Sequence, residues 1–167
     1  MHARSAGTRI AAVVGFGLAA LVAHAQADDA SRSILNGAAV EYLFPEQVTV
    51  AASKASDVTL HFRVAAGYHI NSHTPREEFL IPTTFSIPDG AGVRLDKAVY
   101  PAGTDFTLPL DPTDKLSVYN NEFTIQARIV AEAGNHLVEG KLRFQACDKS
   151  ACLPPRTIPV AFNVVGK

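Results

Sequence analysis

Hydrophobic and polar residues alternate with a period of two along several stretches of the chain. The stretch "VTLHFRV" (58–64) places Val, Leu, Phe and Val on one side and Thr, His and Arg on the other. The stretches "FTIQARIV" (123–130) and "TIPVAFNVV" (157–165) alternate in the same way. This pattern is typical of strands that have one face on a core and the other in water.

Shorter runs of the same kind, separated by the turn sequences "PDGAG", "YPAG", "YNNE" and "EAGN", predict further strands. The ranges are 38–43, 46–52, 67–71, 82–87, 92–99 and 137–146. Eight or nine short strands without an amphipathic helix predict an all-β fold, an immunoglobulin-like antiparallel β-sandwich. A closed barrel is the alternative. Residues 100–115 are rich in Pro, Gly and Asp, so we expect a long loop over one end of the sandwich.

The N-terminal segment has the features of a secretory signal peptide. Two arginines precede a short apolar run (10–22), and "AHAQA" offers small residues for cleavage. We therefore expect residues 1–27 to be removed and residues 28–167 to form a single domain, located in the periplasm. The mature part contains no apolar run long enough to span a bilayer. The net charge of −1, without a Lys/Arg block, argues against nucleic acid as a partner.

The only two cysteines, Cys147 and Cys152, lie in the stretch "FQACDKSACLPP" (144–155). Leu142, Phe144 and Ala146 share the inward phase of the preceding strand. If that strand stays regular, Cys147 lies on its polar face and outside the core. The pair then joins the two arms of a hairpin near its tip.

Two interpretations of this pair remain open on spacing alone. A cross-link around a loop of about six residues stabilises a fold by only about 2 kcal/mol, which is less than a longer loop would give. This favours a bond that can be opened and closed, although hairpin disulfides also act as plain braces. Four intervening residues do not fit the Cys-x-x-Cys motif of thioredoxin-like folds, and a zinc site would need further ligands.

Several motifs resemble, in content and order, those of one known family, the N-terminal periplasmic domain of the thiol:disulfide interchange protein DsbD. The resemblance covers roughly residues 38–165, and its most specific part is the segment that holds both cysteines. It implies an immunoglobulin-like fold with one redox-active cysteine pair, and a role in electron transfer that includes cytochrome c biogenesis. The motifs are "YHINSHTP", "LIPTTFSIPDG", "VYPAG", "LSVYNNEFTI" and "FQACDKSACLPP".

The resemblance also implies roles for individual residues. Cys147 and Cys152 match the redox pair, and Cys152 matches the cysteine that links to the partner. The family has a cap loop with an aromatic side chain over the pair. Its counterpart here is the segment 100–115, with Asp105 and Phe106 as the cap residues and Leu108 as the alternative to Phe106.

Two further positions depart from the family. Where the related domain has aromatic residues near the cysteines, this chain has His69 and Asn71. We therefore expect these two polar side chains near the redox pair, without a defined contact to the sulfur atoms.

The resemblance implies that periplasmic thioredoxin-like oxidoreductases are the partners. Because DsbD continues into membrane and thioredoxin-like domains, we expect a separate membrane or thioredoxin-like protein as electron donor. Thiol–disulfide exchange requires no cofactor and no metal, and we expect a monomer.

Two other functions remain possible at this stage. One is a non-catalytic immunoglobulin-like binding module whose disulfide is only a brace. The other is a periplasmic metal chaperone that uses His61, His69 and His73 together with the reduced thiols.

Overall fold

A computed structural model describes residues 39–43, 47–90, 92–108 and 111–167 of the 167-residue chain. The expected signal peptide (1–27) lies outside these residues. The strands of the described part are β1 (Val40–Leu43), β2 (Gln47–Val50), β3 (Ala55–Val64), β4 (His69–Asn71), β5 (Thr84–Ser86), β6 (Val93–Val99), β7 (Thr104–Leu108), β8 (Asp111–Tyr119), β9 (Glu122–Ala131), β10 (Gly134–Phe144), β11 (Ala146–Cys147) and β12 (Arg156–Gly166).

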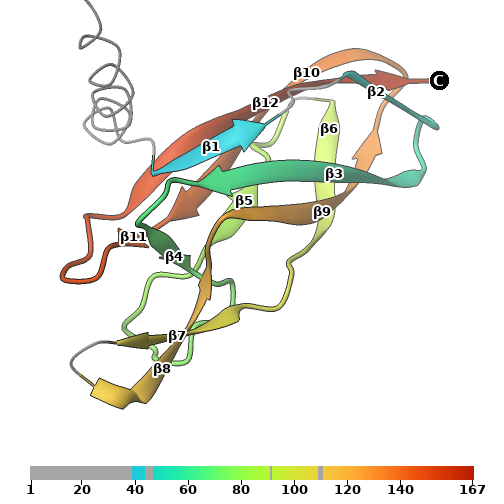
Figure 1. Cartoon of the computed structure of the whole chain (residues 1–167). Helices are drawn as coiled ribbons and strands as arrows, with labels where there is room; N and C mark the ends of the chain where they lie inside the picture. Colours follow the sequence, from blue (N-terminus) through green and yellow to red (C-terminus); the bar gives the residue numbers. More distant parts are fainter. Residues whose placement is uncertain (1–38, 44–46, 91, 109–110) are drawn as a thin grey trace, which may run out of the picture.

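The strands form three four-stranded sheets (Figure 1). Sheet A has the order β1-β3-β9-β6, sheet B the order β2-β12-β10-β5, and sheet C the order β11-β4-β8-β7. Neighbouring strands are antiparallel except β2 and β12, which are parallel. None of the three strand orders in the described part closes on itself, so the closed barrel is not the architecture found.

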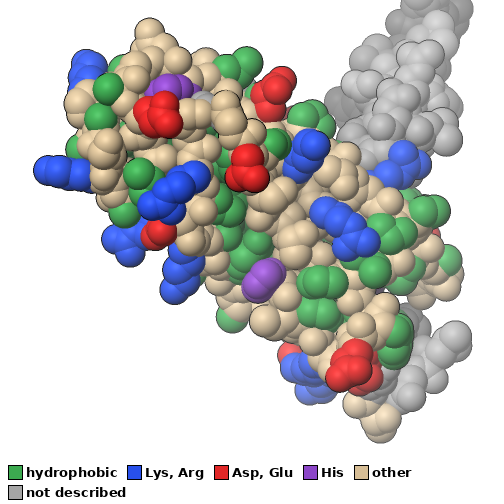
Figure 2. All heavy atoms as spheres, turned by 180° about the vertical axis from the view of Figure 1, so that it is seen from behind, with side chains coloured by type: hydrophobic (Ala, Val, Ile, Leu, Met, Phe, Trp, Pro, Cys, Tyr) green, Lys and Arg blue, Asp and Glu red, His purple; other side chains and the backbone are tan. Residues whose placement is uncertain are grey.

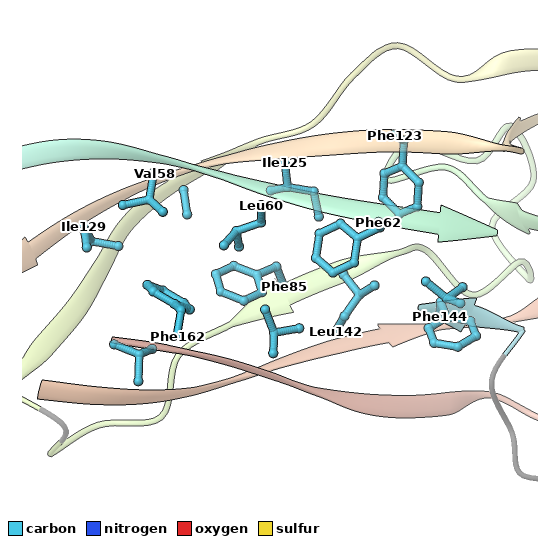
Figure 3. Close-up of a cluster of buried hydrophobic side chains, with 14 of the residues drawn as sticks. Val58, Leu60, Phe62, Phe85, Phe123, Ile125, Ile129, Leu142, Phe144 and Phe162 are labelled. Carbon is cyan, nitrogen blue, oxygen red and sulfur yellow. The ribbon is translucent and has the colours of Figure 1, made fainter. Parts of the chain in front are cut away.

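Sheets A and B enclose the main hydrophobic core (Figure 3). In β3, every second residue from Val58 to Val64 is buried and the residues between them are exposed. The alternation therefore turns one face of the strand inward along its whole length. Leu60 and Phe62 from β3 point toward Leu142 from β10 across the gap between the sheets. The fold is thus an all-β, immunoglobulin-like sandwich, as the sequence predicted.

Each strand range predicted from the sequence overlaps an observed strand, with ends that differ by a few residues. The predicted range 137–146 is divided, because β10 ends at Phe144 and a separate strand, β11, begins at Ala146. The turn "YNNE" joins β8 to β9, and Asn121 there has a φ of 55°. Asparagine adopts this left-handed conformation more readily than most residues, which explains its place in the turn.

The prediction of a long loop at residues 100–115 is wrong. Most of this segment belongs to β7 and β8, which pair in register from Thr104 opposite Val118 to Thr107 opposite Lys115. Proline is tolerated because the first part of β8 pairs only with β7; β4 reaches β8 only at Val118 and Tyr119. A strand that is open on one side can carry a residue without an N–H donor.

The β7–β8 hairpin (yellow in Figure 1) lies at the same end of the molecule as β4 and β11, and the C-terminal end of β12 lies at the other end. Positive and negative side chains are interspersed over the face that Figure 2 shows, in keeping with the small net charge. Among the described residues, no helix is long and apolar enough to cross a membrane.

Two leucines on the same strand provide a matched test of this core. Leu142 of β10 is fully buried, whereas Leu137 is 58% exposed. We expect Leu142→Ala to lower the free energy of unfolding by about 2–5 kcal/mol, because it leaves a cavity between the sheets. Leu137→Ala should change it by about 0.5 kcal/mol or less. Urea denaturation of both variants measures the difference, and equal effects would contradict the described orientation of β10.

Candidate redox site

The site begins where the chain crosses from sheet B to sheet C, at Gln145. The backbone carbonyl of Gln145 accepts a hydrogen bond from the N–H of Asn71 at 3.4 Å, and its side-chain amide donates to the carbonyl of Leu153 at 3.2 Å. The next residue, Ala146, packs in the main core. Because successive strand residues point to opposite faces, Cys147 then lies on the other side of sheet C.

Cys147 and Cys152 form a disulfide with a Cα–Cα distance of 3.9 Å. They lie directly opposite each other in an antiparallel bridge. Backbone hydrogen bonds flank the pair on both sides. The N–H of Asp148 donates to the carbonyl of Ala151 at 2.9 Å, and the N–H of Leu153 donates to the carbonyl of Ala146 at 2.8 Å. This is the arrangement in which opposite residues of an antiparallel ladder approach most closely.

The four-residue connection is organised around Asp148. Its carboxylate accepts hydrogen bonds from the N–H of Ser150 at 2.7 Å, the hydroxyl of Ser150 at 2.8 Å and the N–H of Ala151 at 2.8 Å. These donors, the backbone N–H of Ser150 first, lower the pKa of Asp148, and the nearby His69 adds a smaller effect in the same direction. The turn thus carries an ionised carboxylate beside the cysteines at neutral pH.

The two cysteines differ sharply in exposure. Cys147 is only 2% exposed, whereas Cys152 is exposed. The expected strand phase is correct, since Cys147 faces away from the core that Ala146 enters. Cys147 is nevertheless buried on that face, where Leu108 and Leu116 of the β7–β8 hairpin line, together with both cysteines, a pocket of about 300 Å³.

His69 of β4 lies opposite Cys147 in the register of sheet C. It is 3% exposed and lines the same pocket. The His69 ring also stacks on the ring of Phe106 of β7, with ring centroids 4.1 Å apart and planes inclined by 30°. The cap candidate Phe106 therefore contacts the residue opposite Cys147, while the alternative, Leu108, lines the pocket itself.

Asn71 is fully buried two residues beyond His69. Its side-chain amide donates to the carbonyl of Ile81 at 3.1 Å and reaches the side-chain oxygen of Gln145 at 3.5 Å. Of the two polar residues that the sequence brought toward the cysteines, His69 lines their pocket, whereas Asn71 supports the crossover at Gln145.

Asp105 anchors the hairpin instead of entering the pocket. Its carboxylate binds the Arg76 guanidinium at 2.6 Å and lies 3.6 Å from the Lys115 ammonium. Arg76 also donates to the backbone carbonyl of Lys115 at 2.8 Å. No sequence pattern pointed to this role of Arg76, because its partners are 29 and 39 residues away in the chain.

The three histidines considered as metal ligands do not meet. His61 is exposed on β3, and His73 stacks on Tyr100 at 3.7 Å while its Nδ1 bonds to the carbonyl of Thr83. Among the described residues, no group of three or more His, Cys, Asp or Glu side chains is placed to hold a metal ion.

The architecture and the site together define a class: an all-β domain that carries one disulfide across a local turn, with one cysteine buried and the other exposed. The sequence model of the N-terminal domain of the thiol:disulfide interchange protein DsbD matches residues 39–163. The chain belongs to this family.

Three solved structures are similar to the chain. The reduced N-terminal domain of DsbD from Neisseria meningitidis shares 18% identity over 70% of this chain and 82% of its own, with a TM-score of 0.44. The complex between the DsbD and PilB N-terminal domains of the same organism shares 17% identity over 66% of this chain and 77% of its own, with a TM-score of 0.44. The N-terminal periplasmic domain of ScsB from Proteus mirabilis shares 12% identity over 74% of this chain and 44% of its own, with a TM-score of 0.47. No curated protein matches the chain in sequence.

The burial of His69 makes the stability of the oxidised protein depend on pH. Burial lowers the pKa of His69 from 6.5, and the attraction of Asp148 opposes this less strongly. The unfolded chain therefore binds a proton at this position more readily than the folded protein. The stability associated with the neutral ring is present above pH 6.5 and is lost as the pH falls below it.

We expect the wild type to lose more stability than His69→Phe between about pH 8 and about pH 5, since phenylalanine keeps the stack on Phe106 but cannot take up a proton. Urea unfolding across this range measures the difference between the two curves. Asp148 contributes at lower pH, because its lowered pKa affects stability only below 3.8. Parallel curves for the two proteins would contradict the proposed effect of burial.

Proposed function

We propose that this chain is a periplasmic electron carrier that exchanges its Cys147–Cys152 disulfide with partner thiol oxidoreductases. Membership of the DsbD N-terminal family supports thiol–disulfide interchange. The observation that carries the proposal is the unequal exposure of the two cysteines. An exposed Cys152 can be reached by a partner, and a buried Cys147 is held directly opposite to resolve the intermediate.

The exchange proceeds in two displacements. In the reduced protein, the Cys152 thiolate attacks a disulfide of the partner, and one partner sulfur leaves as a thiolate. Cys147, as thiolate, then attacks the Cys152 sulfur of the mixed disulfide. The Cys147–Cys152 bond forms, the second partner thiolate leaves, and two electrons have passed to the partner. A separate thioredoxin-like or membrane donor restores the dithiol by the reverse route.

Thioredoxin-like oxidoreductases are the proposed acceptors. Their redox pairs react through a mixed disulfide of the kind that Cys152 can form. The DsbD domain of Neisseria meningitidis is described in complex with the PilB N-terminal domain. In the same proposal, the signal peptide (1–27) is cleaved, and residues 28–167 form a single domain that is a monomer. The exchange itself needs no bound cofactor.

The β7–β8 hairpin is the proposed cap of this site. Phe106 rests on His69, and Leu108 lines the cysteine pocket from the same strand. Asp105 fixes the hairpin through Arg76. Such a cover limits access to the dithiol until a partner displaces it.

A redox titration separates a carrier from a structural brace. We expect the purified mature protein to equilibrate with glutathione or thioredoxin buffers, because a carrier must gain and lose electrons reversibly. The measurement is the fraction of free thiol at each buffer ratio. A potential below about −300 mV is typical of a structural disulfide and would falsify the carrier function.

Single-cysteine variants test the division of labour between the sulfur atoms. In Cys147→Ala the exposed Cys152 should accumulate mixed disulfides from a periplasmic extract, because no second thiol resolves them. Cys152→Ala, which retains only the buried Cys147, should accumulate far fewer. Non-reducing electrophoresis with mass spectrometry measures both. Equal trapping by the two variants, or none by either, would contradict the assigned roles.

Two neighbouring residues on β7 test the cap. Phe106→Ala removes the ring that stacks on His69 and should speed reduction of the disulfide by dithiothreitol severalfold. Thr107→Ala is the matched control, because Thr107 is exposed and points to the opposite face of the strand. Stopped-flow measurement of thiol release compares them. Identical rates for both variants and the wild type would remove Phe106 from the cap.

A further inference from the structure

The Nε2 atom of His69 is buried and has no hydrogen-bond partner in the oxidised protein. Other histidines of the described part use a ring nitrogen: Nδ1 of His73 bonds to the carbonyl of Thr83 at 2.9 Å, and Nε2 of His136 bonds to that of Glu132 at 3.0 Å. Leaving a buried polar atom unpaired costs free energy, and in native structures such atoms frequently mark a functional role.

The strand register places His69 directly opposite Cys147 on the same face of sheet C. Residues directly opposite in an antiparallel pair project to the same face, with Cβ atoms about 5 Å apart. Cys147 and His69 are such a pair, and both line the pocket that also contains Cys152. A disulfide sulfur has no proton to donate. A reduced Cys147 has an S–H group, which is the donor that the unpaired nitrogen lacks.

The charges around the ring favour its protonation when a thiolate forms. From the cysteine turn, Asp148 acts on His69 and raises its pKa, against the larger lowering by burial; Lys149 lines the same pocket. The described side chains that the hairpin presents to this space are apolar: Phe106 stacks on the ring, and Leu108 and Leu116 line the pocket.

Asp105 and Lys115 are the charged residues of the hairpin whose side chains the structure describes, and both lie at its anchor, where Asp105 also pairs with Arg76. Among the described side chains, an imidazolium at His69 would therefore have the Cys147 thiolate and the Asp148 carboxylate as its anionic neighbours, with Lys149 as the opposing cation.

We propose that His69 is the proton acceptor of Cys147 during resolution of the mixed disulfide. This role rests on the proposed function, and it means that His69 of β4 activates the buried thiol of Cys147. The family resemblance gave no such role, because the matching position there carries an aromatic residue.

The step balances as follows. The Cys147 thiol transfers its proton to Nε2 of His69, which gives a thiolate and an imidazolium. The thiolate attacks the Cys152 sulfur, so the Cys147–Cys152 bond forms and the bond from Cys152 to the partner breaks. The partner sulfur leaves with the electron pair and takes up a proton from water. The imidazolium then returns its proton to water.

The test uses Cys152→Ala, in which Cys147 is the only thiol of the chain. Thiolate absorbance at about 240 nm, followed against pH, reports the ionisation of Cys147 directly. Adding His69→Phe should raise the midpoint by about one pH unit, a tenfold loss of thiolate, because the acceptor is gone. His69→Gln, which keeps a hydrogen-bonding amide but cannot take the proton, should raise it as well. His61→Gln, at an exposed histidine on β3, is the control and should leave it unchanged.

A second measurement needs no change at His69. Nitrogen chemical shifts of its ring in Cys152→Ala should show that Nε2 is still protonated while the thiolate absorbance rises with pH, and that the imidazolium loses its proton only at higher pH. A neutral ring throughout that rise would overturn the proposal, as would equal midpoints in the His69 variants and the control.

Neither measurement requires a partner, so this inference and the proposed function can fail separately. If the disulfide has a potential below about −300 mV but the His69 variants still shift the Cys147 midpoint, the carrier function is wrong and the role of His69 as proton acceptor stands. If exchange with partners is normal but the His69 variants leave the Cys147 midpoint unshifted, the carrier function stands and the role of His69 is wrong.

Discussion

The pairing of β11 with β4 is the contact on which the rest of the site depends. It consists of two residue pairs, in which Ala146 lies opposite Ile70 and Cys147 lies opposite His69. Ala146 and Ile70 both belong to the main core, so they fix the register through hydrophobic burial. The second pair is thereby held on the other face. A shift by one residue would exchange the two faces and place the sulfur in the core.

The β7–β8 hairpin lies over the face of sheet C that carries Cys147 and His69. Without it, the face that carries Cys147 and His69 would be open to water. The hairpin is joined to the loop after β4 by the ion pair between Arg76 and Asp105, whose side chains are about half exposed. Exposed pairs of this kind contribute about 1 kcal/mol or less. The ion pair therefore contributes little to the attachment of the hairpin, in keeping with its proposed role as a cap that a partner displaces.

The sequence was most informative where structure is determined by neighbours along the chain. The alternation in β3 and in β12 directly reports a half-buried strand, and the crowded cysteines directly report a local cross-link. Both features were predictable because a strand face and a turn depend on a few adjacent residues.

What the sequence could not provide depended on distant segments. Residues 100–115 were expected to be a loop, because they are rich in Pro, Gly and Asp; most of them instead belong to a hairpin, in which β7 pairs with β8. Cys147 was expected on the polar face of its strand, yet it is buried and shares a pocket with Leu108 and Leu116, which lie more than thirty residues away in the chain. The family resemblance identified His69 and the cap candidates as positions of interest, but it could not show that Phe106 stacks on His69.

The turn at residues 148–151 has a consequence for the lifetime of the protein. Its backbone bonds and the Asp148 carboxylate hold the two arms together in addition to the disulfide. Closing so short a loop contributes about 2 kcal/mol, which corresponds to a roughly thirtyfold change in the ratio of unfolded to folded protein. Proteases that digest unfolded chains will therefore degrade the reduced form faster than the oxidised form. Reduction of this disulfide would shorten the lifetime of the domain.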